Sequence, residues 1–149
     1  MTYSHHSDAS GASLRAQRIA AGGSAIGSAI VVQGGLLGAK VNEVEFNATR
    51  NQFLVAWYAQ DGGGVRFAAR YVNADGSFGS GIKIIAPGNA SYDGFSISYH
   101  RLSGTYFAVF HGNSYEDIGV EISADLVTGI EFQVTATGAR LGNFNPKVA

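Results

Sequence analysis

The feature that most constrains this 149-residue chain is an internal repeat of about 50 residues. The segment 53–57 reads Phe-Leu-Val-Ala-Trp and is followed by a polar, glycine-rich loop. The segment 106–110, which begins 53 residues later, reads Tyr-Phe-Ala-Val-Phe and is also followed by a polar loop. Repetition at this period is typical of architectures in which similar units stack on one another. The chain is therefore expected to fold as a stack of such units.

Short apolar segments separated by glycine-rich turns run along the whole chain. One pair of segments and its turn occurs three times, at 13–19 with 26–32, at 65–72 with 82–85, and at 118–122 with 130–134. The chain contains 21 glycines and only two prolines. Many β-branched and aromatic residues between glycine clusters are typical of short strands joined by tight turns. The sequence predicts an all-β protein with four strands in each complete unit.

The predicted strands are apolar on both faces. Residues 53, 55 and 57 alternate with residues 54, 56 and 58, and both sets are apolar or aromatic. Successive side chains of a strand point to opposite faces of the sheet. A sheet with two apolar faces must be covered on both sides. Stacking four-stranded antiparallel sheets about a common axis achieves this, and it defines a β-propeller. Trp57 and Phe110 are then expected in the cores between sheets.

The residues also carry a family resemblance. It rests on Phe-Leu-Val-Ala-Trp, the polar loop that follows it, and Val-Arg-Phe-Ala-Ala-Arg-Tyr-Val-Asn-Ala-Asp-Gly-Ser-Phe-Gly at 65–79. These segments resemble the tandem propeller repeats of many bacterial surface and secreted proteins. The resemblance covers nearly the whole chain, strongest over 42–86 and weaker over 94–136. It implies four-stranded blades in rings of four or more, but no particular activity. The chain departs from the pattern at Phe110, which replaces tryptophan, and at Leu126, which replaces the turn glycine, so the second complete blade is expected to be distorted there.

The repeat predicts two complete blades and a split third blade. Residues 1–33 are a partial blade, 42–86 and 94–136 are complete blades, and 144–149 are the first strand of a shared blade. Three blades are fewer than the rings that the resemblance implies. We therefore expect Phe144–Ala149 to pair with the N-terminal strands of a second copy, giving a homodimer of six blades that closes by rotation. The alternative is that the chain is an excised part of a longer propeller.

Charge, cysteine content and hydropathy restrict the partners. Charged residues make up 14% of the chain and the net charge is −1, so the basic surface of a nucleic-acid-binding protein is missing. The absence of cysteine removes disulfides and thiolate chemistry but leaves the compartment open. No apolar run approaches the roughly 18 residues of a membrane span. The first residues lack the basic end and the apolar region of a secretory signal peptide, so none is expected in this sequence. The sequence therefore leaves the localisation open, and one alternative is that the chain is a fragment of a secreted or surface protein.

Few side chains suit catalysis or metal binding. The adjacent His5-His6 would point to opposite faces of a strand, whereas metal ligands must converge, so neither a metal nor another cofactor is expected. Asp61 and Asp117 fall in loops on one rim and would supply the carboxylate pair of a glycoside hydrolase. Asp75 and Asp125 sit in turns, where aspartate bonds to its own backbone. The main expectation is a protein without enzymatic activity, and a glycoside hydrolase is the alternative.

The loops between second and third strands, and between fourth and first strands, are expected to share a rim. They combine carboxylates and amides, which bond to sugar hydroxyls, with aromatic rings, which stack on sugar C–H faces. The sequence thus predicts a non-catalytic, lectin-like module that self-associates and binds a carbohydrate or a protein at this rim. A purely structural repeat is the alternative. The candidate ligand-binding residues are Tyr58, Gln60, Asp61, Tyr92, Asp93, His111, Asn113, Tyr115 and Asp117.

Overall fold

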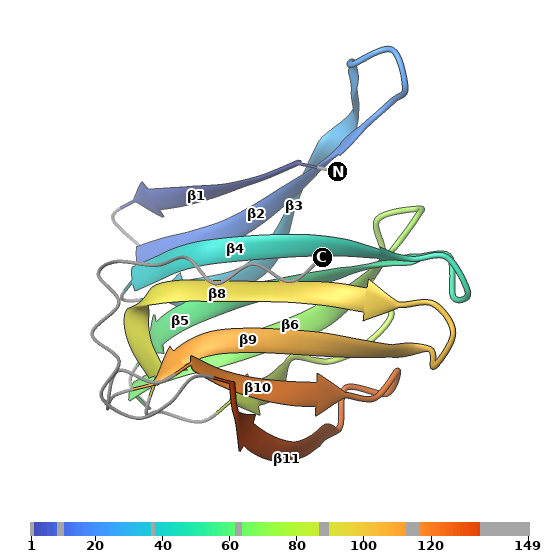
Figure 1. Ribbon diagram of the computed structural model, residues 1–149. Helices are drawn as coiled ribbons and strands as arrows, with labels where there is room; N and C mark the ends of the chain where they lie inside the picture. Colours follow the sequence, from blue (N-terminus) through green and yellow to red (C-terminus); the bar gives the residue numbers. More distant parts are fainter. Residues whose placement is uncertain are drawn as a thin grey trace.

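Three antiparallel β-sheets make up the described part of the protein (Figure 1). The computed structural model describes residues 2–8, 11–36, 38–61, 64–86, 90–112 and 117–134. These ranges contain eleven strands and no helix, and hence no helix long and apolar enough to cross a membrane. The all-β class predicted from the sequence is confirmed.

Within each sheet the strands lie side by side in chain order. The N-terminal sheet contains β1 (Thr2–Asp8), β2 (Gly11–Ile19) and β3 (Ala25–Leu36). The middle sheet contains β4 (Gly38–Asn47), β5 (Gln52–Asp61), β6 (Gly64–Asn73) and β7 (Lys83–Ala86). The C-terminal sheet contains β8 (Ala90–His100), β9 (Thr105–Gly112), β10 (Asp117–Ile122) and β11 (Thr128–Gln133).

One turn with the same hydrogen bonds recurs in all three sheets. In the middle sheet, the backbone N–H of Asn73 donates to the carbonyl of Ser77, and that of Gly76 donates to the carbonyl of Asn73, both at 2.9 Å. The same two bonds close the turns at 20–24 and 123–127. The turns join β2 to β3, β6 to β7, and β10 to β11, so these strand pairs are equivalent.

The N-terminal sheet has three strands where the other two have four. Ser4 of β1 pairs with Arg15 of β2, just as Trp57 of β5 pairs with Ala68 of β6. By this register β1 corresponds to β5, and the described residues of this sheet include no counterpart of β4. The segment expected to supply one from a second copy, Phe144–Ala149, lies outside the described residues.

The turn at Leu126 itself is regular, and the irregularity of this blade lies beside it, as a register shift between Val120 and Ile122 in the pairing of β10 with β11. Leu126 has a φ of 59°, in the left-handed region where Gly76 has a φ of 95°. A side chain in this conformation costs about 1–2 kcal/mol. The Leu126 side chain is only 4% exposed and packs in the core, and burying a leucine side chain contributes about 1.5–3 kcal/mol. Burial therefore offsets the strain and preserves the turn without glycine.

The middle sheet is buried on both faces. Toward the N-terminal sheet it presents Val55, Trp57, Ala68 and Val72, which pack with Ala12, Leu14, Ala16, Val32 and Leu36. Toward the C-terminal sheet it presents Leu54, Ala56, Tyr58, Phe67, Ala69, Tyr71 and Ile85, which pack with Phe95, Ile97, Tyr106, Ala108, Phe110, Val120, Ile122 and Leu126. Trp57 is 0% exposed and Phe110 is 4% exposed, so both lie in cores between sheets as predicted.

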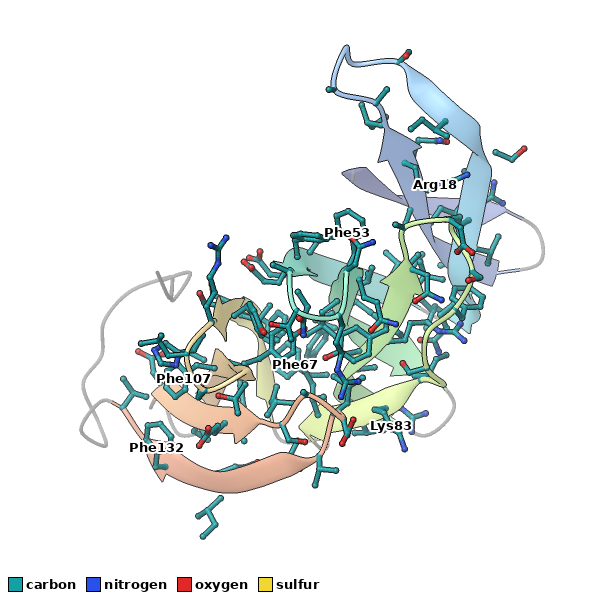
Figure 2. The ribbon with its side chains drawn as sticks, turned by 90° about the vertical axis from the view of Figure 1, so that its right-hand side faces the viewer. Arg18, Phe53, Phe67, Lys83, Phe107 and Phe132 are labelled. Carbon is teal, nitrogen blue, oxygen red and sulfur yellow. The ribbon has the colours of Figure 1, made fainter. Side chains whose placement is uncertain are left out.

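The two four-stranded sheets meet along their first strands. β4 and β8 lie side by side and run in the same direction (Figure 1). Figure 2 shows the molecule from the side, with Phe67 between the middle and C-terminal sheets and with Phe107 and Phe132 farther out on the C-terminal sheet. This arrangement gives the C-terminal sheet one face in the core and one face turned away from it.

Candidate functional site

Four of the predicted rim residues, Gln60, Asp61, His111 and Asp117, lie by their backbone at one end of the sheets. β5 ends at Asp61 and β9 ends at Gly112, and both strands end on the left in Figure 1. His111 pairs with Asp117 across β9 and β10. Gln60 pairs with Val65 in the corresponding hairpin.

The remaining predicted residues divide into three groups. Tyr92 and Asp93 lie at the beginning of β8, where the pairing with β9 is irregular. Asn113 and Tyr115 lie outside the described residues. Tyr58 is only 2% exposed, and its ring packs edge-on against Phe67 with centroids 5.0 Å apart. The Tyr58 ring therefore lies in the core and is not part of the rim surface.

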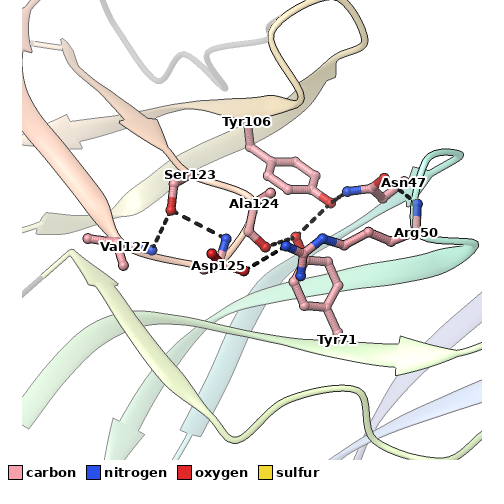
Figure 3. Close-up of polar contacts among 8 residues, drawn as sticks. All are labelled: Asn47, Arg50, Tyr71, Tyr106, Ser123, Ala124, Asp125 and Val127. Carbon is pink, nitrogen blue, oxygen red and sulfur yellow. Dashed lines mark hydrogen bonds and ion pairs between the residues drawn. The ribbon is translucent and has the colours of Figure 1, made fainter.

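A buried hydrogen-bond network lies at the opposite end, between the middle and C-terminal sheets (Figure 3). Asn47, which is 1% exposed, donates from Nδ2 to the hydroxyl of Tyr106 at 2.9 Å. The hydroxyl oxygens of Tyr71 and Tyr106 lie 3.0 Å apart, and Tyr71 also donates to the carbonyl of Ala124 at 3.0 Å. These contacts tie β4 and β6 to β9 and the β10–β11 turn.

An ion pair continues this network to the surface. The backbone N–H of Arg50 donates to Oδ1 of Asn47 at 3.0 Å, and its Nη2 donates to Oδ1 of Asp125 at 2.6 Å. The Asp125 side chain is 78% exposed, so the pair contributes at most about 1 kcal/mol. Asp75, at the equivalent turn, instead accepts hydrogen bonds from the N–H and hydroxyl of Ser77. The two turn aspartates therefore have different roles.

The chemistry of the two buried tyrosines is that of neutral phenols. Tyr106 is 0% exposed and Tyr71 is 2% exposed. Loss of solvation disfavours the phenolate, and this raises the pKa of both side chains above the ordinary value near 10. Both hydroxyls therefore stay protonated at neutral pH. The network holds two sheets together and offers no general base or nucleophile.

The raised tyrosine pKa values make the stability depend on pH above about pH 10. In that range the unfolded chain loses phenolic protons that the folded protein retains, so the free energy of unfolding falls with rising pH. The slope is up to about 1.4 kcal/mol per pH unit for each tyrosine, and the contribution is complete at lower pH. Urea unfolding from about pH 8 to about pH 12 measures it. Tyr106→Phe and Tyr71→Phe should each reduce the slope; a slope that neither changes would contradict the assignment.

A second surface lies on the face of the C-terminal sheet turned away from the core (Figure 2). Phe107 and Phe132 stack there with ring centroids 5.4 Å apart. Gly119 lies opposite Phe132 in the β10–β11 pair. A Cβ atom at Gly119 would lie 2.8 Å from the Phe132 ring and 2.9 Å from the Phe107 ring. The two rings therefore close over a position that only glycine fits without displacing them.

An open depression of about 390 Å³ lies beside these rings. Glu121 lines one side, and the β8–β9 turn lines the other with His100, Ser103 and Thr105. Nδ1 of His100 lies 2.8 Å from Oγ of Ser103, which lies 2.7 Å from Oγ1 of Thr105. Among the described residues no carboxylate bonds to His100, so the pair lacks the third group of a catalytic triad. These contacts close a turn.

The described ranges contain no group of three or more His, Asp or Glu side chains that could hold a metal ion. No protein-family model, curated protein or solved structure matches the chain. Its function therefore has to be inferred from its own geometry.

Sequence reasoning missed both the tyrosine network and the outer aromatic pair. One available signal was that Tyr71 and Tyr106 stand at core positions of their strands, and a buried tyrosine hydroxyl usually requires a partner. The Phe107–Phe132 contact joins two strands that are not adjacent in the sheet, so no local pattern indicates it.

Proposed function

We propose that the chain is a set of β-propeller blades that acts by binding and assembly and not by catalysis. The middle sheet supports this, because both of its faces are apolar and each is covered by another sheet. The two contacts use equivalent positions: Leu14 of β2 and Phe67 of β6, 53 residues apart, each face the next sheet along the chain. A contact that repeats in this way is the building principle of a ring of blades.

In this proposal, β4 and β8 are the inner strands of two complete blades. The N-terminal sheet is the incomplete third blade, and Phe144–Ala149 of a second copy supplies its missing inner strand. Two copies then form a homodimeric ring of six blades. The alternative, that the chain is part of a longer propeller, uses the same blades with a different neighbour.

The ligand proposed for the rim is a carbohydrate or another protein. The support is that the β5–β6 and β9–β10 hairpins turn at the same end, which brings Asp61 and Asp117 to one rim by their backbone positions. The polar groups there suit hydroxyl-rich ligands. A purely structural repeat remains the alternative from another class, and a glycoside hydrolase would use the same two carboxylates.

A glycan array tests the carbohydrate ligand. We expect the wild type to bind and the double variant Asp61→Asn with Asp117→Asn to bind at least about tenfold more weakly, because a hydrogen bond to a charged group contributes about 1.5–3 kcal/mol. Asp75→Asn is the matched control, since the Asp75 carboxylate accepts its hydrogen bonds within an exposed turn. An array with no bound glycan would favour the structural repeat. Release of reducing sugar, lost in the double variant, would favour the hydrolase.

A further inference from the structure

We infer that the outer face of the C-terminal sheet docks on the outer face of the N-terminal sheet of a second copy of this chain. The inference rests on the proposed function and specifies the surfaces that would close the ring. By register, the outer C-terminal face carries Phe107, Gly119, Glu121 and Phe132, together with Val109, which is only 5% exposed. By register, the outer N-terminal face carries Arg15, Gln17 and Val31, together with Ser13, which is only 7% exposed.

The outer C-terminal face occupies the positions that the middle sheet uses to contact the C-terminal sheet. Phe107 and Val109 follow Leu54 and Ala56 by 53 residues, and Leu54 and Ala56 are both 0% exposed in the core between those sheets. The two sheets also have the same strand order. The C-terminal sheet therefore repeats a surface that is covered by a sheet elsewhere in the same molecule.

The last described residues of the C-terminal sheet leave large apolar side chains in solvent. Ile130 is 89% exposed, Phe132 is 47% exposed and Val134 is 50% exposed. On the outer N-terminal face, Val31 is 48% exposed. Grouped exposed apolar side chains are typical of surfaces that contact another protein.

The two outer faces carry opposite charges at positions where the internal faces carry none. Arg15 stands where the middle sheet has Ala68, and Glu121 stands where the middle sheet has Tyr71, judged from the equivalent turns. Within the described ranges neither Arg15 nor Glu121 has an ion-pair partner. A contact of unlike faces places a surface that carries a carboxylate against one that carries a guanidinium group, whereas a contact of like faces places two surfaces of the same charge against each other.

The outer C-terminal face also has a hollow, and the outer N-terminal face has an arginine with free hydrogen-bond donors. The outer C-terminal face is hollowed beside Phe132 and Glu121 by the depression of about 390 Å³. On the outer N-terminal face, Arg15 is held by a hydrogen bond from its Nε to the hydroxyl of Ser13 at 3.2 Å, and its remaining guanidinium N–H groups can still donate to a partner. A carboxylate and an aromatic ring are the groups that an arginine head contacts best.

A contact between two different surfaces can be tested by mixing two variants. Phe132→Asp disables the outer C-terminal face and Val31→Asp disables the outer N-terminal face. Because two copies of the same variant share no intact contact, each variant alone should run as a monomer of 15.5 kDa. The wild type should have twice that mass. A mixture of the two variants retains one intact contact per pair, so a heterodimer should form.

Size-exclusion chromatography with multi-angle light scattering at micromolar concentration measures the mass of the wild type, of each variant and of their mixture. Leu102→Asp is the control, since Leu102 is 93% exposed in the β8–β9 turn, and it should keep the wild-type mass. Circular dichroism checks that each variant is folded. If an aspartate variant fails to fold, the variants Glu121→Arg and Arg15→Glu are used in its place. Each of these two changes alone should weaken the dimer, and the two combined in one chain should restore the dimer.

Three results would overturn the inference. One is a wild type with the mass of a single chain. Another is a dimer that Phe132→Asp abolishes and Val31→Asp leaves intact, since this indicates a C-terminal face that meets itself. The third is a mixture that stays monomeric although both variants are folded. A wild-type monomer that still binds glycans would refute this contact and the proposed homodimer but not the proposed ligand. A dimer that Phe132→Asp and Val31→Asp both leave intact would refute only this contact, and a dimer that binds no glycan would refute only the proposed ligand.

Discussion

Replacing Trp57 with alanine is expected to lower the free energy of unfolding by about 3–5 kcal/mol. Trp57 is 0% exposed in the core between the N-terminal and middle sheets, so truncation leaves a large cavity between them. The indole Nε1 also donates to Oε1 of Gln33 in β3 at 2.7 Å. Urea unfolding followed by circular dichroism measures the change, because Trp57 is the only tryptophan in the chain and its fluorescence is lost with it.

Two variants separate the packing of Trp57 from its hydrogen bond. Trp57→Phe retains a ring but leaves the Gln33 side-chain oxygen without its donor, so an intermediate loss of about 1–3 kcal/mol is expected. Leu102→Ala removes a side chain that is 93% exposed and should change the stability by less than about 0.5 kcal/mol. A loss below about 1 kcal/mol for Trp57→Ala would mean that the N-terminal sheet does not pack on the middle sheet in solution.

Replacing Tyr106 with phenylalanine is expected to cost about 2–3 kcal/mol, although only one oxygen atom is removed. The change leaves Nδ2 of the buried Asn47 without its acceptor and removes the neighbour of the Tyr71 hydroxyl. A buried polar group that loses its partner costs about 1–3 kcal/mol. Chemical denaturation of the single variants and of the Tyr71→Phe, Tyr106→Phe double variant completes a double-mutant cycle, and we expect a coupling energy above about 0.5 kcal/mol.

Tyr99→Phe is the matched control for this cycle. The Tyr99 ring lies 5.0 Å from the Tyr106 ring, but its hydroxyl bonds to Thr49 in an exposed contact. Water can replace that bond, so the loss should stay within about 0.5 kcal/mol. Equal losses for Tyr99→Phe and Tyr106→Phe would show that the network is not isolated from solvent.

The strands and their buried faces could be predicted because their cause is local. Alternation at 53–58 places Trp57 on one face and Leu54 on the other, and the structure buries both at 0% exposure. The turns at 20–24 and 73–77 follow from short glycine-containing segments, whereas the turn at 123–127 forms without glycine. β4 begins at Gly38, earlier than residue 42, where the sequence predicted the blade to begin, because strand pairing with β5 extends it beyond the apolar pattern.

The hydrogen-bond network and the rim were harder to predict because they depend on contacts between distant segments. The network joins Asn47 to Tyr106 and Tyr71 to Ala124, and no local spacing indicates which hydroxyl meets which amide. Tyr58 was expected at the rim from the polarity of its loop, but its position in the alternating strand pattern places the ring in the core. The rim itself stays a prediction, since it depends on where each loop directs its side chains.

Leu126 has a consequence for how chains of this kind are detected. A search for tandem copies that requires Asp-Gly at the corner between the last two strands would overlook the third copy in this chain, where Leu126 occupies the glycine position. The turn at Leu126 has the same two backbone hydrogen bonds and the same left-handed backbone conformation as the turn at Gly76. The corner therefore forms without the glycine by which it is most easily recognised in a sequence. Profiles that accept a buried aliphatic residue at this corner should reveal further copies in diverged sequences.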